Sequence, residues 1–89
     1  MRHYNLTITG KVQRVGFRFT CMEAAYHHGI NGYVMNSGQN AVYVEAEGND
    51  TNLGHFIDWC RKGPLGARVG NVDIVEAPIR NFTAFEIRE

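Results

Sequence analysis

The sequence contains no apolar run that approaches the ~18 residues needed to cross a membrane as a helix, so it predicts no membrane-spanning helix. Its two cysteines, Cys21 and Cys60, are too few for a disulfide framework and favour two reduced, half-buried thiols. Nine Lys and Arg balance nine Asp and Glu, which leaves no net basic surface to attract nucleic acid or an anionic membrane. No apolar stretch follows Arg2, so no signal peptide is expected and the cytoplasm is the expected location.

The length and composition fit one globular domain spanning residues 1–89. Hydrophobic residues make up 44% of the chain and charged residues 20%, close to the averages for folded proteins, which argues against disorder. The chain is small and has no long apolar strand edge, so we expect a monomer.

Charge is unevenly distributed along this neutral chain. The first 22 residues contain four cations and no acid, whereas residues 23–60 contain five acids and no Lys or Arg. The cations of the first segment are Arg2, Lys11, Arg14 and Arg18. A local cationic segment indicates a site for a small anion rather than a face for a polyanion, although chance clustering on a solvated surface explains the count equally well.

Hydrophobic periodicity predicts an order of strands and helices. Alternation of apolar and polar residues predicts strands at 4–10, 31–36 and 41–47, with further strand-like segments at 69–76 and 82–88. One helix is predicted from about Phe19 to His28, and a second begins after Asn49 or Asp50. In the second helix a buried stripe is predicted at Leu53, Phe56, Ile57 and Cys60.

This β-α-β-β-α-β order, with an extra strand at the end, predicts a ferredoxin-like α+β sandwich in which two helices cover one face of an antiparallel or mixed sheet. The first two strands are expected to be parallel, with the third between them. The loop after the first strand and the end of the second strand then lie at the same edge of the sheet.

Two polar residues are candidates for a site at that edge. Arg18 lies at a helix start, where the helix dipole disfavours a cation unless an anion lies between them. An exposed arginine that tolerates a small penalty is the alternative. Asn36 can donate and accept hydrogen bonds and so hold a water molecule, or it can bond its own backbone before a hairpin.

The remaining ionisable residues show no pattern typical of a site. No two of the histidines have metal-ligand spacing, and we expect them at the surface or at its edges. They are His3, His27, His28 and His55. Glu45 and Glu47 share one face of the third strand and are expected to be solvated.

Several blocks of the sequence resemble the acylphosphatase family, in order and over nearly the whole chain. Residues 10–18, Gly-Lys-Val-Gln-Arg-Val-Gly-Phe-Arg, match the family loop Gly-x-Val-Gln-Gly-Val-Gly-Phe-Arg at every defined position except Arg14. Residues 29–36, Gly-Ile-Asn-Gly-Tyr-Val-Met-Asn, are similar to the family's second block. The segments 46–48, 63–69 and 85–88 are also similar.

The resemblance implies an enzyme that hydrolyses the carboxyl–phosphate bond of small acyl phosphates without metal, cofactor or covalent intermediate. It implies that Arg18 and the amides of the loop bind the phosphate and that Asn36 positions the attacking water. The implied loop consists of Gln13, Arg14, Val15, Gly16, Phe17 and Arg18. The leaving carboxylate has a pKa of about 4, so no general acid is required.

Other readings of the sequence remain open. Arg14 stands where the family has glycine, so a catalytically impaired domain with a binding or interaction role is one alternative. An RNA-recognition module is another, because residues 15–19 loosely resemble an aromatic RNA-binding motif. That motif belongs on a central strand, whereas here it falls in a loop.

Overall fold

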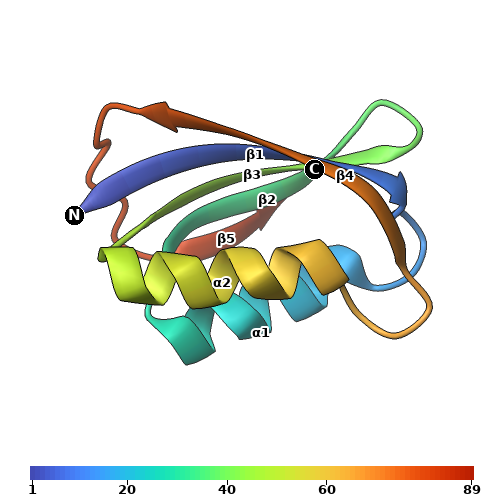
Figure 1. Cartoon of the computed structure of the whole chain (residues 1–89), viewed down its shortest axis with the longest axis horizontal. Helices are drawn as coiled ribbons and strands as arrows, with labels where there is room; N and C mark the ends of the chain where they lie inside the picture. Colours follow the sequence, from blue (N-terminus) through green and yellow to red (C-terminus); the bar gives the residue numbers. More distant parts are fainter.

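Five strands and two helices account for most of the chain, and the computed structural model describes all of residues 1–89. The elements in chain order are β1 (Arg2–Lys11), α1 (Phe17–His28), β2 (Asn31–Ser37), β3 (Ala41–Gly48), α2 (Asp50–Lys62), β4 (Arg68–Ala77) and β5 (Phe85–Arg88). Both helices lie on one side of the sheet (Figure 1). Neither helix is long and apolar enough to cross a membrane.

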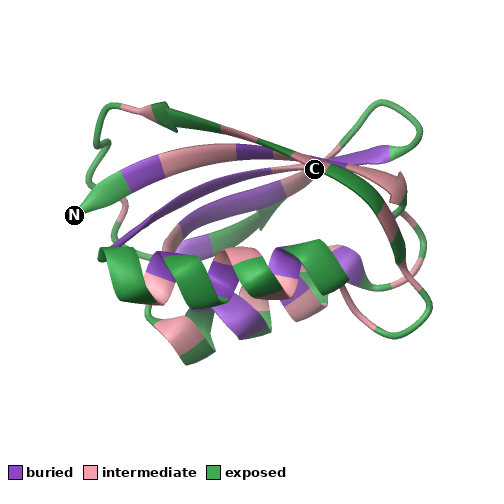
Figure 2. Ribbon diagram, in the orientation of Figure 1, coloured by how far each residue is buried: buried purple, intermediate pink, exposed green.

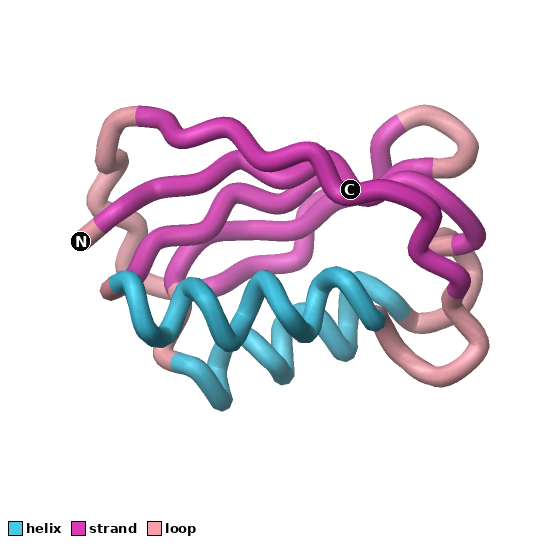
Figure 3. The backbone as a smooth tube through the Cα atoms, viewed as in Figure 1, coloured by secondary structure: helices cyan, strands magenta, loops and turns pink.

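The strands form a single mixed sheet in the order β4-β1-β3-β2-β5. β3 pairs antiparallel with both β1 and β2, so β1 and β2 run parallel to each other on either side of it. β5 pairs parallel with β2. The predicted ferredoxin-like topology, including the third strand between the first two, is therefore confirmed. Figure 3 shows that the β1–α1 loop, the β2–β3 hairpin and the α2–β4 loop gather at one end of the molecule.

Local signals set the helix boundaries. Gly29 takes a left-handed conformation with φ 67° and ends α1 as predicted, and the Asn49 side chain caps α2 by accepting a hydrogen bond from the Asn52 amide at 2.8 Å. The predicted start of the first helix at Phe19 is wrong by one half-turn. Gly16, at φ 75°, precedes a helix that already begins at Phe17, so the first helical turn contains Arg18.

The core fills the space between the sheet and the helices, as the burial colours in Figure 2 show. Most helix-facing residues of the central strands are fully buried, among them Leu6, Ile8, Val34, Val42 and Val44. The predicted stripe of α2 packs onto them, with Leu53, Phe56 and Cys60 buried and Ile57 half-buried. Cys21 and Cys60 are unpaired, but both are fully buried rather than half-buried as predicted.

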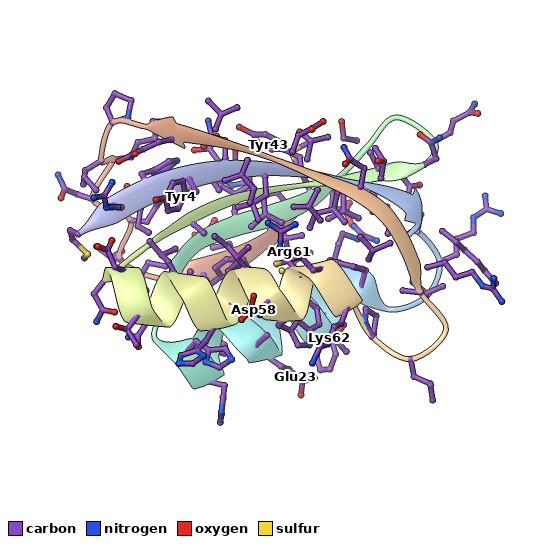
Figure 4. All side chains as sticks on the ribbon, viewed as in Figure 1. Tyr4, Glu23, Tyr43, Asp58, Arg61 and Lys62 are labelled. Atoms are coloured by element: carbon purple, nitrogen blue, oxygen red, sulfur yellow. The ribbon has the colours of Figure 1, made fainter.

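The face of the sheet turned away from the helices is more buried than the sequence predicted. β4 and β5 form opposite edges of the sheet, so the connection 78–84 must cross from one edge to the other. It covers part of the face turned away from the helices, on which Tyr43 lies (Figure 4). Glu45 and Glu47, expected to be solvated, are 6% and 2% exposed, and His3, expected at the surface, is 1% exposed.

Glu47 attaches this connection to the sheet. Its Oε1 accepts a hydrogen bond from the Phe82 amide at 2.9 Å, and its Oε2 accepts from the Arg80 amide and lies 2.8 Å from His3 Nδ1. The ring of Phe82 stacks on His3. Burial by itself raises the pKa of Glu47, but the hydrogen bonds from Arg80, His3 and Phe82 outweigh it and hold the pKa below its ordinary value of 4.5.

Glu45 is the second anchored carboxylate. It accepts hydrogen bonds from the hydroxyls of Tyr33 at 2.7 Å and Tyr43 at 2.9 Å, and it pairs with the guanidinium of Arg80 at 3.2 Å and with His3 Nε2 at 3.0 Å. Burial by itself raises its pKa, whereas the donors outweigh burial and leave the pKa lowered. Burial and the bond to Glu45 raise the pKa of Tyr43 to about 12, so this hydroxyl keeps its proton and remains a donor.

Candidate active site

The loop between β1 and α1 is held in place at three points. Val12 and Phe17, at its two ends, are buried in the core. Between them the Gln13 side chain donates hydrogen bonds to the carbonyls of Gly38 at 3.0 Å and Ala41 at 2.8 Å, which fixes the loop to the β2–β3 hairpin. The loop therefore has a defined shape before any ligand binds.

The loop presents free amide groups at a helix N-terminus. No side chain caps α1, its first turn contains no acid, and the backbone amides of residues 14–19 make no hydrogen bond within the chain. Unpartnered amides at this end of a helix carry a partial positive charge and bind anions. The Arg18 side chain lies in the same turn, is partly exposed and forms no ion pair.

A hollow of about 270 Å³ lies at this point and brings the predicted residues together. Arg18 from α1 and Asn36 from β2 both line it. Asn36 reaches the hollow because β2 runs parallel to β1, so the C-terminal ends of both strands lie at the same end of the sheet. The side-chain amide of Asn36 makes no hydrogen bond within the chain, so its oxygen and its nitrogen are both available to a ligand or a water molecule.

Some residues of the predicted loop contribute to the hollow and others do not. Arg14, Gly16 and Phe17 line it together with Arg18. The Gln13 side chain points instead to the hairpin, and Val15 packs against the core, so these two residues have only backbone groups to offer.

Three residues that the sequence did not single out also line the hollow: Phe19, Ile87 and Glu89. β5 carries the last two to the site, because it pairs parallel with β2 and places Ile87 opposite Val34, two residues before Asn36. The parallel pairing of a short last strand leaves no signal in local periodicity. The exposure of the Phe19 side chain, 57%, is visible only in the folded chain.

The histidines do not take part in the site. His27, His28 and His55 form a cluster on the outer surface of the two helices, with ring centroids 4.8 Å and 5.8 Å apart. Burial, and then the neighbouring rings, lower the pKa of His28. No group of three or more His, Cys, Asp or Glu side chains is arranged to hold a metal ion.

Comparisons with known proteins agree with this geometry. The family model for acylphosphatase matches residues 4–87. The chain belongs to the acylphosphatase family. An acylphosphatase from Synechococcus sp. (strain CC9605) is 44% identical over 81 residues, which cover 91% of this chain and 98% of the relative. An acylphosphatase from Ligilactobacillus salivarius (strain UCC118) is 37% identical over 89 residues, covering 98% of each chain.

The fold of the chain also agrees with that of a solved acylphosphatase structure. The crystal structure of acylphosphatase from Bacillus subtilis superimposes with a TM-score of 0.96 at 27% identity, over 100% of both chains. The chain is thus an enzyme of the acylphosphatase type, a hydrolase of the carboxyl–phosphate bond in acyl phosphates. The ferredoxin-like fold expected from the order of strands and helices is the acylphosphatase fold.

Arg14, which stands where the acylphosphatase loop has glycine, has an unusual backbone conformation. Arg14 has φ 62°, in the left-handed region that costs a residue with a Cβ about 1–2 kcal/mol. We expect Arg14→Gly to raise the free energy of unfolding by about 1 kcal/mol, measured by urea denaturation, because glycine adopts this φ without strain.

Asn81 supplies a matched control for this prediction. It is the other non-glycine residue at positive φ, also at 62°, and asparagine tolerates that region better than arginine. Asn81→Gly should therefore stabilise less than Arg14→Gly. A loss of stability in Arg14→Gly would mean that contacts of the arginine side chain outweigh its backbone strain.

Proposed function

We propose that Arg18 and the free amides of loop 13–18 bind the phosphoryl group of the acyl phosphate and that Asn36 positions the attacking water. The observation that carries this assignment is that Arg18, Asn36 and the amides surround one hollow without other partners in the chain. The planar guanidinium can contact two phosphoryl oxygens at once, and the α1 N-terminus adds its dipole.

The reaction then needs few groups from the protein. The water oxygen attacks phosphorus while the bond from phosphorus to the acyl oxygen breaks, and the bonding electron pair leaves with the carboxylate. The attacking oxygen keeps one of its two protons, and the other passes to another oxygen of the phosphate product. A carboxylate with a pKa of about 4 leaves without protonation, and a loose phosphoryl transition state requires mainly position and positive charge.

We further propose that residues 1–89 act as one domain and as a monomer in the cytoplasm, on small acyl phosphates, without a metal, a cofactor, nucleic acid or a membrane. The two cysteines are unpaired, which fits a reducing compartment. The zero formal charge of the chain favours a small substrate over a polyanion.

Hydrolysis of benzoyl phosphate by the purified chain, with Asn36→Ala beside it, tests the assignment. We expect Asn36→Ala to lower kcat by about 100-fold, comparable to removing one preorganised donor from a transition state. The inhibition constant of inorganic phosphate should change by less than about twofold, because Arg18 and the amides remain.

Ser37→Ala, at the next and exposed position of β2, is the control for disturbance of the strand and should keep wild-type kcat. If Asn36→Ala weakens phosphate binding and spares turnover, Asn36 binds phosphate rather than water. If the wild-type chain fails to hydrolyse benzoyl phosphate, the impaired-domain alternative holds.

A further inference from the structure

A second hollow, of about 460 Å³, adjoins the candidate active site, and Arg14 lines both. Lys11 at the end of β1 forms another part of its wall, and Gly38 and Gln39 of the β2–β3 hairpin close the opposite side. Val12 is its one hydrophobic lining residue. The wall between the two hollows is thus a short, cationic segment of the loop.

The shape of the second hollow is built into the fold. Gln13 lines it and holds the loop to the hairpin through its bonds to Gly38 and Ala41. The left-handed φ of Arg14 turns the chain at this point. A ligand group that enters between loop and hairpin therefore meets a preformed polar space.

The two sides of the hollow at the candidate active site differ in charge. Lys11 and Arg14 are exposed and form no ion pair, whereas the ion pairs of the molecule engage Arg2, His3, Arg80 and Arg88. The other rim of the active hollow carries the apolar Phe19 and Ile87 and the carboxylate of Glu89. An anionic group next to the bound phosphate is attracted to the first side and repelled from the second.

We propose that Lys11 and Arg14 form a subsite for a second anionic group on the acyl part of the substrate. The preferred substrates are then acyl phosphates whose acyl group carries a further carboxylate or phosphate. This inference rests on the proposed function, because it requires the phosphoryl group at Arg18. From the phosphoryl group bound at Arg18, the acyl group of the bound substrate extends past Arg14, and its anionic end lies between Lys11 and the hairpin.

Rigid aromatic substrates test the subsite. The probes are 3- and 4-carboxybenzoyl phosphate, their neutral carbamoyl counterparts, and 4-phosphonobenzoyl phosphate, which separates a phosphate-like end from a carboxylate. For each, kcat/KM is measured for wild type and variants, and the charge preference is the ratio of the charged to the neutral substrate. Comparing this ratio between wild type and variant cancels the intrinsic reactivity of each acyl phosphate.

We expect the wild type to prefer at least one charged isomer over its neutral counterpart. This charge preference should fall about threefold in Lys11→Gln and about threefold in Arg14→Gln, which is the range of a solvent-exposed charge pair. Arg14→Gln keeps a Cβ at the strained position, so it removes charge without relieving strain. Lys11→Arg and Arg14→Lys should retain the preference. Added NaCl should reduce it in wild type.

Lys62→Gln is the matched control, because Lys62 is exposed on α2 (Figure 4) and lines neither hollow. It should leave the charge preference and the benzoyl phosphate activity unchanged. The inference is overturned if no charged isomer is preferred, or if the preference survives both Lys11→Gln and Arg14→Gln, while benzoyl phosphate is still hydrolysed. Loss of benzoyl phosphate hydrolysis by the wild type would instead refute the proposed function.

Discussion

Replacing Arg18 by alanine should lower kcat/KM for benzoyl phosphate by about a thousandfold or more, in line with other arginines that act on transferring phosphoryl groups. The structure gives Arg18 no competing partner: it forms no ion pair and lines the hollow that Asn36 also lines. Removing the guanidinium leaves the amides of the loop, the α1 dipole and the exposed Arg14, which has no planar contact assigned to the phosphoryl group, to offset its negative charge.

Arg18→Lys should also lose most of the activity, because an ammonium group is a point charge and cannot make the planar two-pronged contact. Arg61→Ala is the matched control. Arg61 is exposed on α2 (Figure 4) and lines a different hollow, so its variant should stay within about twofold of wild type. If Arg18→Ala keeps more than about a tenth of the wild-type kcat/KM, phosphate is bound elsewhere.

Replacing Glu47 by glutamine should lower the free energy of unfolding by about 3–5 kcal/mol, because the buried donors that face this ionised carboxylate lose their acceptor. The carboxylate accepts from His3 and from two backbone amides of the connection 78–84. Glutamine is similar in size, but its NH2 group would face donors. Urea denaturation at pH 7 measures the change.

Acid should have the same effect on the wild type. The pKa of Glu45 and of Glu47 is lower in the folded chain than its ordinary value of 4.5. Their ionised forms therefore stabilise the fold fully above about pH 4.5 and lose this contribution as the pH falls through the lower folded values. The acid-induced loss should be smaller in Glu47→Gln than in wild type.

Glu86→Gln makes the same chemical change at an exposed carboxylate of β5, whose distance to Arg88 is 3.6 Å. It should alter stability by less than about 0.5 kcal/mol. A Glu47→Gln variant within about 1 kcal/mol of wild type would show that the connection 78–84 does not depend on this carboxylate.

The sequence predicted the features that depend on local pattern. Alternation along 41–47 and the spacing from Leu53 to Cys60 predicted a strand and a helix that the structure confirms. The crossover rule then predicted that the loop after β1 and the end of β2 share an edge, and the structure places Arg18 and Asn36 at one hollow there.

The features that the sequence did not predict depend on contacts between distant segments. Glu47 was expected in solvent because its neighbours alternate like a half-exposed strand, but its partners Arg80 and Phe82 lie more than 30 positions away. Ile87 and Glu89 reach the site only through the pairing of β5 with β2. No local pattern encodes either contact.

The short last strand has a consequence for dynamics. β5 has four residues and pairs on one side only, with β2, so few hydrogen bonds need to break for it to detach. Native-state amide exchange should therefore be faster in β5 than in the central β3, through a local opening well below the global free energy of unfolding. Each opening removes Ile87 and Glu89 from the hollow, so at any moment only the closed fraction of the molecules has a complete site.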